Sequence, residues 1–166
     1  MLNKLLLTGF MGSGKSTTLV EIKRLAPEWR CLDLDDLLAP AGEKVAALIQ
    51  RVGWDEFRRL EKARLAELLQ SDEALVLALG GGTLVQGLPL VQQHSEALLV
   101  HLAVPFALCW QRIQQDPSER PLVALGEAKV RALFDERQAL YQQAHLTVDG
   151  SLAPREVALA ILQRAR

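Results

Sequence analysis

Cysteine and long apolar runs are both scarce in this chain. Its 166 residues include two cysteines, Cys31 and Cys109, and no pair spaced as CxxC. A disulfide scaffold and a structural zinc site are therefore disfavoured, and a reducing compartment fits this composition. The apolar run near the N-terminus is shorter than the core of a signal peptide, and no run reaches the roughly 18 apolar residues of a membrane span. The sequence predicts a cytoplasmic protein with no membrane partner.

Net charge and aromatic content are also low. Nineteen Lys+Arg against twenty Asp+Glu leave a formal net charge of −1. Without a basic field a nucleic-acid partner is disfavoured, and any bound anion must be held by local groups. Aromatic residues make up 5% of the chain, whereas apolar residues make up 49% and charged residues 23%. This is the composition of a globular domain with a packed core, and we expect a monomer.

Short apolar runs alternate along the chain with segments of helical periodicity. The runs predict five strands, at residues 5–8, 30–34, 74–79, 98–104 and 145–148. Helices are expected at 15–26, in two short pieces within 37–52, at 55–70 with Asp55 as N-cap, from Pro89, at 105–115, at 126–144 and from Pro154. Apolar strands separated by helices form a parallel sheet that is buried on both faces. The predicted fold class is therefore α/β, with three layers (α/β/α) around a five-stranded parallel sheet.

Two segments depart from this plain alternation. Residues 36–60 insert helices between the second and third strands, and residues 116–125 form a polar loop flanked by prolines. Neither segment is a separate domain, so residues 1–166 are expected to form a single domain. Both segments are candidate lids at the carboxyl ends of the strands, where α/β proteins bind ligands.

A phosphate-binding loop follows the first predicted strand. Residues 9–16 read G-F-M-G-S-G-K-S, which matches G-x-x-x-x-G-K-[ST] between a strand and a helix. Gly12 and Gly14 let the backbone turn its N–H groups toward phosphate oxygens, beside the positive end of the following helix. Lys15 would reach the β- and γ-phosphates, and the Ser16 hydroxyl could ligate Mg²⁺. The loop predicts nucleotide binding but does not identify what receives the phosphate.

Two carboxylates close the second predicted strand. Asp33 and Asp35 are spaced i, i+2, so on a strand both would project from one face beside the phosphate loop. One could hold Mg²⁺ through water while the other accepts a hydrogen bond from the acceptor hydroxyl. The alternative is that aspartates at a strand end form turns or helix caps, which we expect of Asp36.

Several arginines could bind an anionic acceptor. Arg58 and Glu61 lie three residues apart on one helix face, where they could also be a surface ion pair of little consequence. Arg137 lies in a polar stretch of a later helix and is ambiguous alone. Arg120 lies in the 116–125 loop, where an arginine could neutralise charge on a transferring phosphoryl group.

Three consecutive glycines, Gly80, Gly81 and Gly82, follow the third predicted strand. Because glycine costs backbone entropy, three in a row indicate close approach of the backbone to a ligand rather than a simple turn. An acceptor that meets arginines, a backbone amide and an aspartate would be small, anionic and hydroxylated. A carboxylate would suit the arginine fork, which can bind it bidentately.

Together these motifs resemble the shikimate kinase family. The resemblance runs in the family's order through the phosphate loop, D-L-D at 33–35, F-R-x-x-E at 57–61, the three glycines, R-P-L at 120–122 and R-x-x-L-Y at 137–141. It covers almost the whole chain, and the combination is far more specific than the phosphate loop alone. It implies a P-loop NTPase fold of the nucleoside-monophosphate-kinase-like type. The implied activity is transfer of the γ-phosphoryl group of ATP to the 3-hydroxyl of shikimate, in aromatic amino-acid biosynthesis.

The resemblance also implies roles for individual residues. ATP would be bound by Gly12, Ser13, Gly14, Lys15, Ser16, Thr17, Arg112, Arg120 and Pro154. Shikimate would be bound by Asp35, Arg58, Gly80, Gly81, Gly82 and Arg137, with the two arginines on its carboxylate. The catalytic residues would be Lys15, Asp35 and Arg120, with Asp35 as candidate base. Ser16 and Asp33 would position Mg²⁺, the implied cofactor, and Glu61 would orient Arg58.

The chain departs from the family pattern beside the second aspartate. Leu34 stands where the family usually has Thr or Ser, and the segment after Asp36 lacks the usual isoleucine and glutamate. This segment builds the acceptor region, so two alternatives stay open: a kinase for gluconate, a nucleoside monophosphate or another hydroxylated anion, and an ATP-binding protein without turnover. Few aromatic residues argue against a nucleotide acceptor. The presence of Lys15, Asp35 and Arg120 together argues against a protein that only binds.

Overall fold

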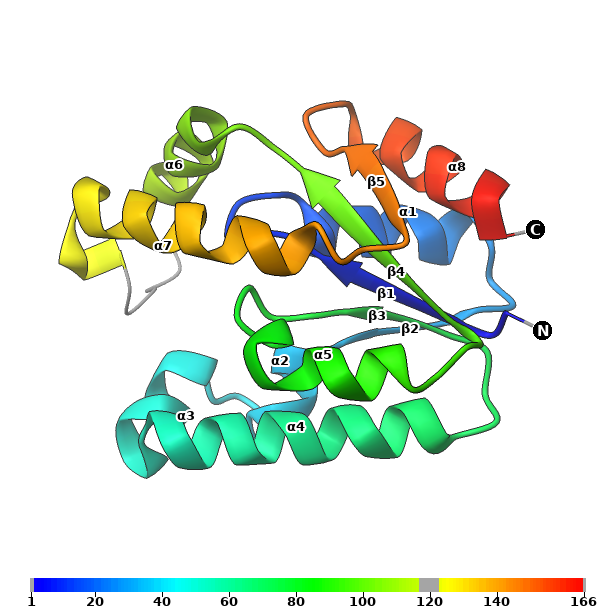
Figure 1. Ribbon diagram of the computed structural model, residues 1–166, viewed down its shortest axis with the longest axis horizontal. Helices are drawn as coiled ribbons and strands as arrows, with labels where there is room; N and C mark the ends of the chain where they lie inside the picture. The colour runs from blue at the N-terminus through cyan, green and yellow to red at the C-terminus, as the bar shows by residue number, and fades with distance from the viewer. Residues whose placement is uncertain (1, 117–122, 166) are drawn as a thin grey trace.

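A five-stranded parallel sheet forms the centre of the molecule (Figure 1). The computed structural model describes residues 2–116 and 123–165. Its strands are β1 (Lys4–Thr8), β2 (Arg30–Asp33), β3 (Leu75–Ala78), β4 (Ala97–Ala103) and β5 (Leu146–Asp149), in the spatial order β2-β3-β1-β4-β5. The chain crosses to opposite sides of β1 to form β3 and β4. Such a change of direction opens a crevice at the carboxyl end of the central strand, which is where the phosphate loop begins.

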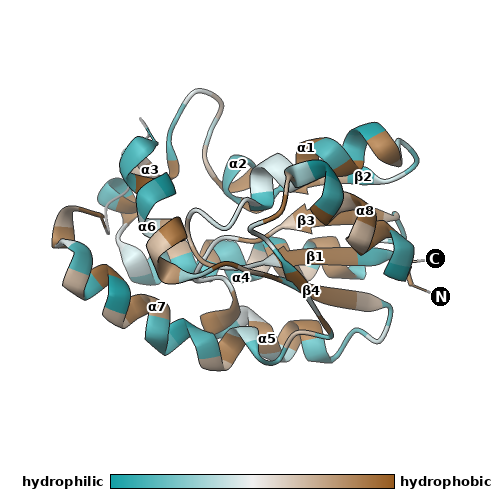
Figure 2. Cartoon of the chain, turned by 90° about the horizontal axis from the view of Figure 1, so that it is seen from above, coloured by the Kyte–Doolittle hydropathy of each residue, from teal (hydrophilic) through white to brown (hydrophobic). Residues whose placement is uncertain are grey.

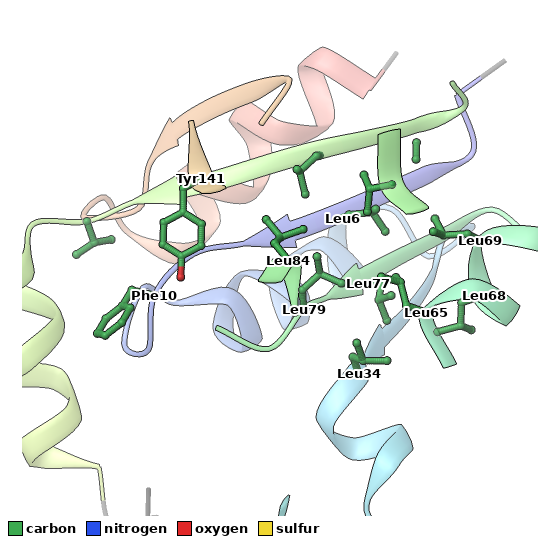
Figure 3. Packing of buried hydrophobic residues seen from close by; sticks show 14 of the residues in the cluster. Leu6, Phe10, Leu34, Leu65, Leu68, Leu69, Leu77, Leu79, Leu84 and Tyr141 are labelled. Atoms are coloured by element: carbon green, nitrogen blue, oxygen red, sulfur yellow. The ribbon is translucent and has the colours of Figure 1, made fainter. Parts of the chain in front are cut away.

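Apolar residues of β1 pack on both faces of the sheet, as the unbroken leucine run predicts. Leu6 belongs to one buried cluster, whereas Leu5 and Leu7 belong to the other, and all three are fully buried. The first cluster extends to Phe10 and Tyr141 beside the phosphate loop (Figure 3). Figure 2 shows the central strands in the brown of apolar residues, between helices that are mixed in polarity. The predicted three-layer α/β/α class is confirmed.

Helices cover both faces of the sheet. Buried residues of α1 (Lys15–Leu25) and α8 (Pro154–Ala165) pack with Leu5 and Leu7 on one face. The other face is covered by α4 (Trp54–Gln70), α5 (Leu84–Gln92), α6 (Phe106–Gln115) and α7 (Glu127–Tyr141). The remaining short helices are α2 (Leu34–Leu38), α3 (Val45–Val52) and the 3-10 helix η1 (Val123–Leu125). No described helix is long and apolar enough to cross a membrane.

Several predicted boundaries are wrong, and the helix predicted at 126–144 ends at Tyr141. The second strand ends at Asp33 and α2 begins at Leu34, so residues 34 and 35 are helical. Helix α4 has Gly53 as its N-cap and begins at Trp54, which puts Asp55 inside the first turn. Helix α5 begins at Leu84 and contains Pro89 in its interior instead of starting there. The predicted break between two short helices, near residues 40–42, is confirmed.

Candidate active site

The phosphate loop joins β1 to α1 and turns as its glycines predict. Gly12 and Gly14 have φ of 77° and 90°, in the left-handed region that favours glycine, and Gly14 is the N-cap of α1. Lys15 folds back over the loop, because its Nζ donates to the carbonyl oxygens of Gly9 at 2.7 Å and Phe10 at 3.0 Å. The positive end of α1 and the Lys15 ammonium therefore lie at one place, as phosphate binding requires.

Ser16 and Asp33 meet at the start of α1. The Ser16 hydroxyl donates a 2.8 Å hydrogen bond to Oδ2 of Asp33. The other oxygen of Asp33, Oδ1, accepts from the backbone N–H of Asp35 at 3.0 Å and so caps α2. The interpretation of Asp33 and Asp35 as neighbours on one strand face is therefore wrong, since only Asp33 is in the strand. The turn into α2 nevertheless keeps both carboxylates at the cleft.

Asp35, which is partly buried, is the carboxylate of this pair whose pKa is raised. Burial raises its pKa from 3.8 to about 6; the negative charges of Asp33 and then Glu61 add to the rise, while the Lys15 ammonium opposes it. Its Oδ1 also lies 3.2 Å from the point where a Cβ on Gly80 would be. Asp35 thus packs against the backbone of the glycine segment, on the side of the phosphate loop where an acceptor hydroxyl would sit.

Arg58 and Glu61 form a buried pair, not a surface one. Arg58 Nη1 donates to Glu61 Oε1 at 2.6 Å, and the two side chains are 17% and 3% exposed. The Arg58 guanidinium also lies 5.3 Å from the ring centre of Trp54 and 5.5 Å from that of Phe57. Arg58 is thus held by an ion pair and two aromatic rings and is not a free surface charge.

Arg137 reaches the same region from α7. Its Nη1 donates to the carbonyl oxygen of Gly81 at 2.7 Å, and the Tyr141 hydroxyl donates to the same oxygen at 2.9 Å. Burial lowers the pKa of the Arg137 guanidinium, and the like charge of Arg58 acts in the same direction. The two arginines from different helices are therefore brought together, as the acceptor hypothesis requires.

Two of the three glycines, Gly80 and Gly82, lie in close approach to other groups, and these groups are the protein's own side chains. A Cβ on Gly82 would overlap the Arg58 guanidinium and would lie 2.6 Å from Arg137 Nη1. A Cβ on Gly80 would be crowded by Glu61 and by Thr83 Oγ1, each at 3.1 Å. None of the three has a φ in the left-handed region. At Gly80 and Gly82 glycine leaves space for these side chains, whereas a Cβ on Gly81 would meet no atom closer than 3.7 Å.

Arg112 and Pro154 line the far side of the phosphate loop. Arg112 Nη1 donates to the carbonyl oxygen of Gly12 at 3.0 Å, and both residues border the cleft together with Leu152. Ser13 is buried, whereas Thr17 is exposed and its hydroxyl donates to Gly14 O at 2.9 Å. Residues 117–122 of the expected lid loop, which include Arg120, lie outside the described residues.

One cleft of about 870 Å³ connects these groups. The phosphate loop forms one end, and Asp35, Arg58, Gly81 and Arg137 form the other. Sequence reasoning missed several members of the acceptor end. Its apolar wall is made by Val45, Ile49, Trp54 and Phe57. Thr83, directly after the glycines, and Tyr141 were also missed, because their partners Glu61 and Gly81 are distant in sequence.

Oxygen donors at this site fit a hard cation. The described residues include no cluster of three or more His, Cys, Asp or Glu side chains that could hold a metal. The Ser16 hydroxyl and the Asp33 carboxylate face each other at the phosphate loop. Mg²⁺ is usually held by one or two protein oxygens together with substrate phosphates, so this donor set suits Mg²⁺ and not a structural metal.

Comparison with known proteins gives a consistent result. The family model for shikimate kinase matches residues 11–166. A shikimate kinase from Salinibacter ruber is 34% identical, over 95% of this chain and 81% of its own. The structure of a shikimate kinase from Acinetobacter baumannii in complex with shikimate is 32% identical, with a TM-score of 0.87 over 99% of this chain and 93% of that one.

More distant structures share the architecture only. A gluconokinase from Sinorhizobium meliloti is 16% identical, with a TM-score of 0.68 over 98% of this chain and 91% of that one. At that identity the likeness shows the fold alone. The fold is thus that of P-loop kinases, and the arrangement of the cleft, not the fold, must identify the acceptor.

Proposed function

The chain belongs to the shikimate kinase family, and from that premise we propose that its cleft transfers the γ-phosphoryl group of ATP to the 3-hydroxyl of shikimate. One observation carries the proposal: the phosphate loop, the Asp35 carboxylate and the Arg58 and Arg137 guanidiniums line a single cavity. A triphosphate on the loop and a small hydroxy acid on the arginines would face each other there.

On the ATP side, the phosphate loop binds and orients the triphosphate. Backbone N–H groups around Gly12–Gly14 and the N-terminus of α1 would hold the phosphates, and Lys15 would neutralise charge on the β- and γ-phosphates. Arg112 and Pro154 border the cleft beyond Gly12 and Gly14, where the adenine would lie. Ser13 and Thr17 complete the loop's contacts with the nucleotide.

Mg²⁺ fits the Ser16 and Asp33 oxygens, which already lie within 2.8 Å of each other. When bound, the ion would neutralise phosphate charge and favour in-line transfer. Asp33 acts here as an orienting group, because its other oxygen is engaged by the Asp35 N–H. The Ser16–Asp33 bond keeps both oxygens aimed at the loop.

On the acceptor side, two guanidiniums and one carboxylate select for a hydroxylated acid. Arg58 and Arg137 meet at Gly82, where they would bind a carboxylate from two directions. Asp35 would accept a hydrogen bond from the reacting hydroxyl and take its proton as the phosphoryl group transfers. The apolar wall from α3 and α4 would pack against the carbon ring.

Two segments of one domain would close over the bound substrates. We propose that residues 1–166 act as a single kinase domain, with residues 36–60 as the acceptor-binding insertion and 116–125 as the lid loop. Lid arginine Arg120 would neutralise the transferring phosphoryl group. The helices of the insertion support this assignment, since α2, α3 and the start of α4 contribute Asp35, Ile49 and Arg58 to the cleft. A cytoplasmic monomer remains our expectation.

The two alternatives make different demands on the cleft. A gluconate kinase would share the fold and the phosphate loop, and its acceptor also carries a carboxylate and hydroxyls. The apolar wall of Val45, Ile49, Trp54 and Phe57 favours a compact ring over an open-chain polyol. A binding protein without turnover would not need the partly buried Asp35 carboxylate, whose desolvation is unfavourable.

A coupled ADP-release assay over shikimate, quinate, gluconate and nucleoside monophosphates tests the proposal. We expect the highest kcat/KM with shikimate, with one ADP released per molecule of shikimate 3-phosphate detected by mass spectrometry. A higher kcat/KM with gluconate or a nucleoside monophosphate would favour the first alternative. ATP binding by calorimetry without acceptor-dependent ADP release would favour the second.

A further inference from the structure

Thr83 uses its hydroxyl in an unexpected way. It is the N-cap residue of α5, a position where threonine normally accepts a hydrogen bond from a backbone N–H of the first turn. Here the side chain makes no capping bond. Instead, Oγ1 donates a 2.6 Å hydrogen bond to Oε2 of Glu61 on α4, and the Thr83 residue is only 2% exposed. With φ of −56° and ψ of −39° the Thr83 backbone is helical and not that of a capping residue, so its hydroxyl is used for a contact with a buried carboxylate.

Glu61 needs this contact because it is buried as well. The residue is 2% exposed, and its Oε1 accepts the Arg58 hydrogen bond at 2.6 Å. A buried carboxylate is costly unless each oxygen has a donor. Arg58 donates to one oxygen and Thr83 to the other, so both oxygens of the carboxylate are held by hydrogen bonds. A carboxylate fixed at both ends can hold the guanidinium in one orientation.

The neighbouring glycine leaves room for this arrangement. A Cβ on Gly80 would lie 3.1 Å from both Glu61 Oε2 and Thr83 Oγ1, the two atoms of the hydrogen bond. The Thr83 methyl, Cγ2, lies on another side, 3.6 Å from the point where a Cβ on Gly87 would be. The hydroxyl and the methyl of Thr83 thus have separate surroundings, and substitution can test them separately.

We propose that Thr83 is a positioning residue for the acceptor: through Glu61 it holds the Arg58 guanidinium in the orientation that binds the substrate carboxylate. The inference rests on the proposed function, because it assigns Thr83 to the acceptor half of that site. Thr83 is not among the residues that line the cleft, and it acts through a chain of two hydrogen bonds, each 2.6 Å long.

The pair Thr83→Val and Thr83→Ser separates the hydroxyl from the shape. Valine keeps the β-branched shape and removes the donor, whereas serine keeps the donor and removes the methyl. We expect Thr83→Val to raise the KM and the Kd for shikimate about tenfold, which is the usual effect of losing a hydrogen bond to a charged group. KM for ATP should stay within about twofold of the wild-type value, and Thr83→Ser should restore shikimate binding to within about threefold.

Two further comparisons exclude a merely structural role. Thr147→Val, at an exposed threonine of β5, is the matched control and should leave both KM values unchanged. In a Glu61→Gln background Thr83→Val should have little additional effect, because the link to Arg58 is already weakened. A merely structural role would instead affect KM for both substrates equally. A lower melting temperature is expected in either case, because Glu61 Oε2 loses its donor. If Thr83→Val does not fold, Thr83→Ala with Thr83→Ser supplies the same comparison.

The outcomes separate this inference from the proposed function. Wild-type protein that does not phosphorylate shikimate would overturn both. Active wild-type protein whose shikimate KM is unchanged by Thr83→Val would overturn the inference alone. The same holds if Thr83→Ser is as impaired as Thr83→Val, or if the Glu61→Gln and Thr83→Val effects simply add.

Discussion

The Ser16 hydroxyl donates a 2.8 Å hydrogen bond to Oδ2 of Asp33, which ties the first turn of α1 to the end of β2. Asp33→Asn should raise the Mg²⁺ concentration for half-maximal activity by roughly 10- to 100-fold, as loss of an orienting carboxylate usually does. Asparagine is also a good N-cap, so α2 should be retained. Titration of activity against free Mg²⁺ measures the effect, with Asp72→Asn as an exposed control. An unchanged Mg²⁺ requirement would remove Asp33 from the metal site.

The Lys15 ammonium lies over the phosphate loop. Lys15→Met keeps the length of the side chain and removes the ammonium that bonds to Gly9 and Phe10. We expect kcat to fall by roughly 10²–10³, because a charge that stabilises the transferring group is lost. Steady-state kinetics check this, and Lys23→Met, an exposed lysine on the same helix, is the control. Turnover close to wild type would contradict the phosphate-loop assignment.

Arg58 and Arg59 are adjacent but differ in surroundings. Arg58 lies in the cleft and pairs with buried Glu61, whereas Arg59 pairs with the exposed Glu56. Arg58→Lys keeps a charge near Glu61 but loses the planar fork that grips a carboxylate. We expect KM for shikimate to rise about tenfold with little change in KM for ATP. Arg59→Lys should change neither constant. Equal rises in both constants for Arg58→Lys would refute the division of the cleft into two halves.

The pKa of Asp35 predicts a pH-dependent effect on stability. Because its folded-state pKa is raised from 3.8 to about 6, the stability linked to this group is lost as pH rises through that window. Above pH 6 the ionised, partly buried carboxylate costs at most roughly 3 kcal/mol. Asp35→Asn should therefore raise the melting temperature of the ligand-free protein by several degrees at pH 8, and by progressively less toward pH 4.

Scanning calorimetry between pH 4 and pH 8 tests whether the gain in melting temperature increases with pH. A gain in melting temperature that is the same at all pH values would show that the pKa of Asp35 is not raised. The same variant should lose roughly 10²–10⁴ in kcat if Asp35 is the general base. We therefore expect a variant that is more stable but inactive. That result would show that the carboxylate that destabilises the fold is the same group that the reaction needs.

Patterns that depend on local physics were read correctly from the sequence. Apolar strands predicted the parallel sheet, and the spacing of Gly12, Gly14 and Lys15 predicted the loop. The D-L-D segment was misread because alternation is typical of a strand, whereas Asp33 caps a helix that begins at Leu34. Pro89 was misread as a helix start. It lies in the interior of α5, on the exposed surface, and its missing N–H would have served the carbonyl of Val85, which is also exposed.

Contacts between distant residues could not be predicted. Thr83 meets Glu61, and Tyr141 meets Gly81, only after α4, α5 and α7 have packed on the same face of the sheet. No local signal distinguishes such a threonine from an ordinary helix cap. The glycine segment was assigned to close approach, but its neighbours in the structure are Arg58 and Arg137, which only the packed helices bring there.

The bare α-carbon of Gly82 has a consequence for handling the protein. Folding brings the Arg58 and Arg137 guanidiniums together around it, and of these two Arg58 alone is paired with Glu61 by hydrogen bond. The repulsion that remains between the two like charges is relieved when a small anion enters. Sulfate or acetate in a storage buffer should therefore raise the melting temperature and act as a competitive inhibitor toward the acceptor. Kinetic constants for this chain are comparable only at a fixed concentration of buffer anion.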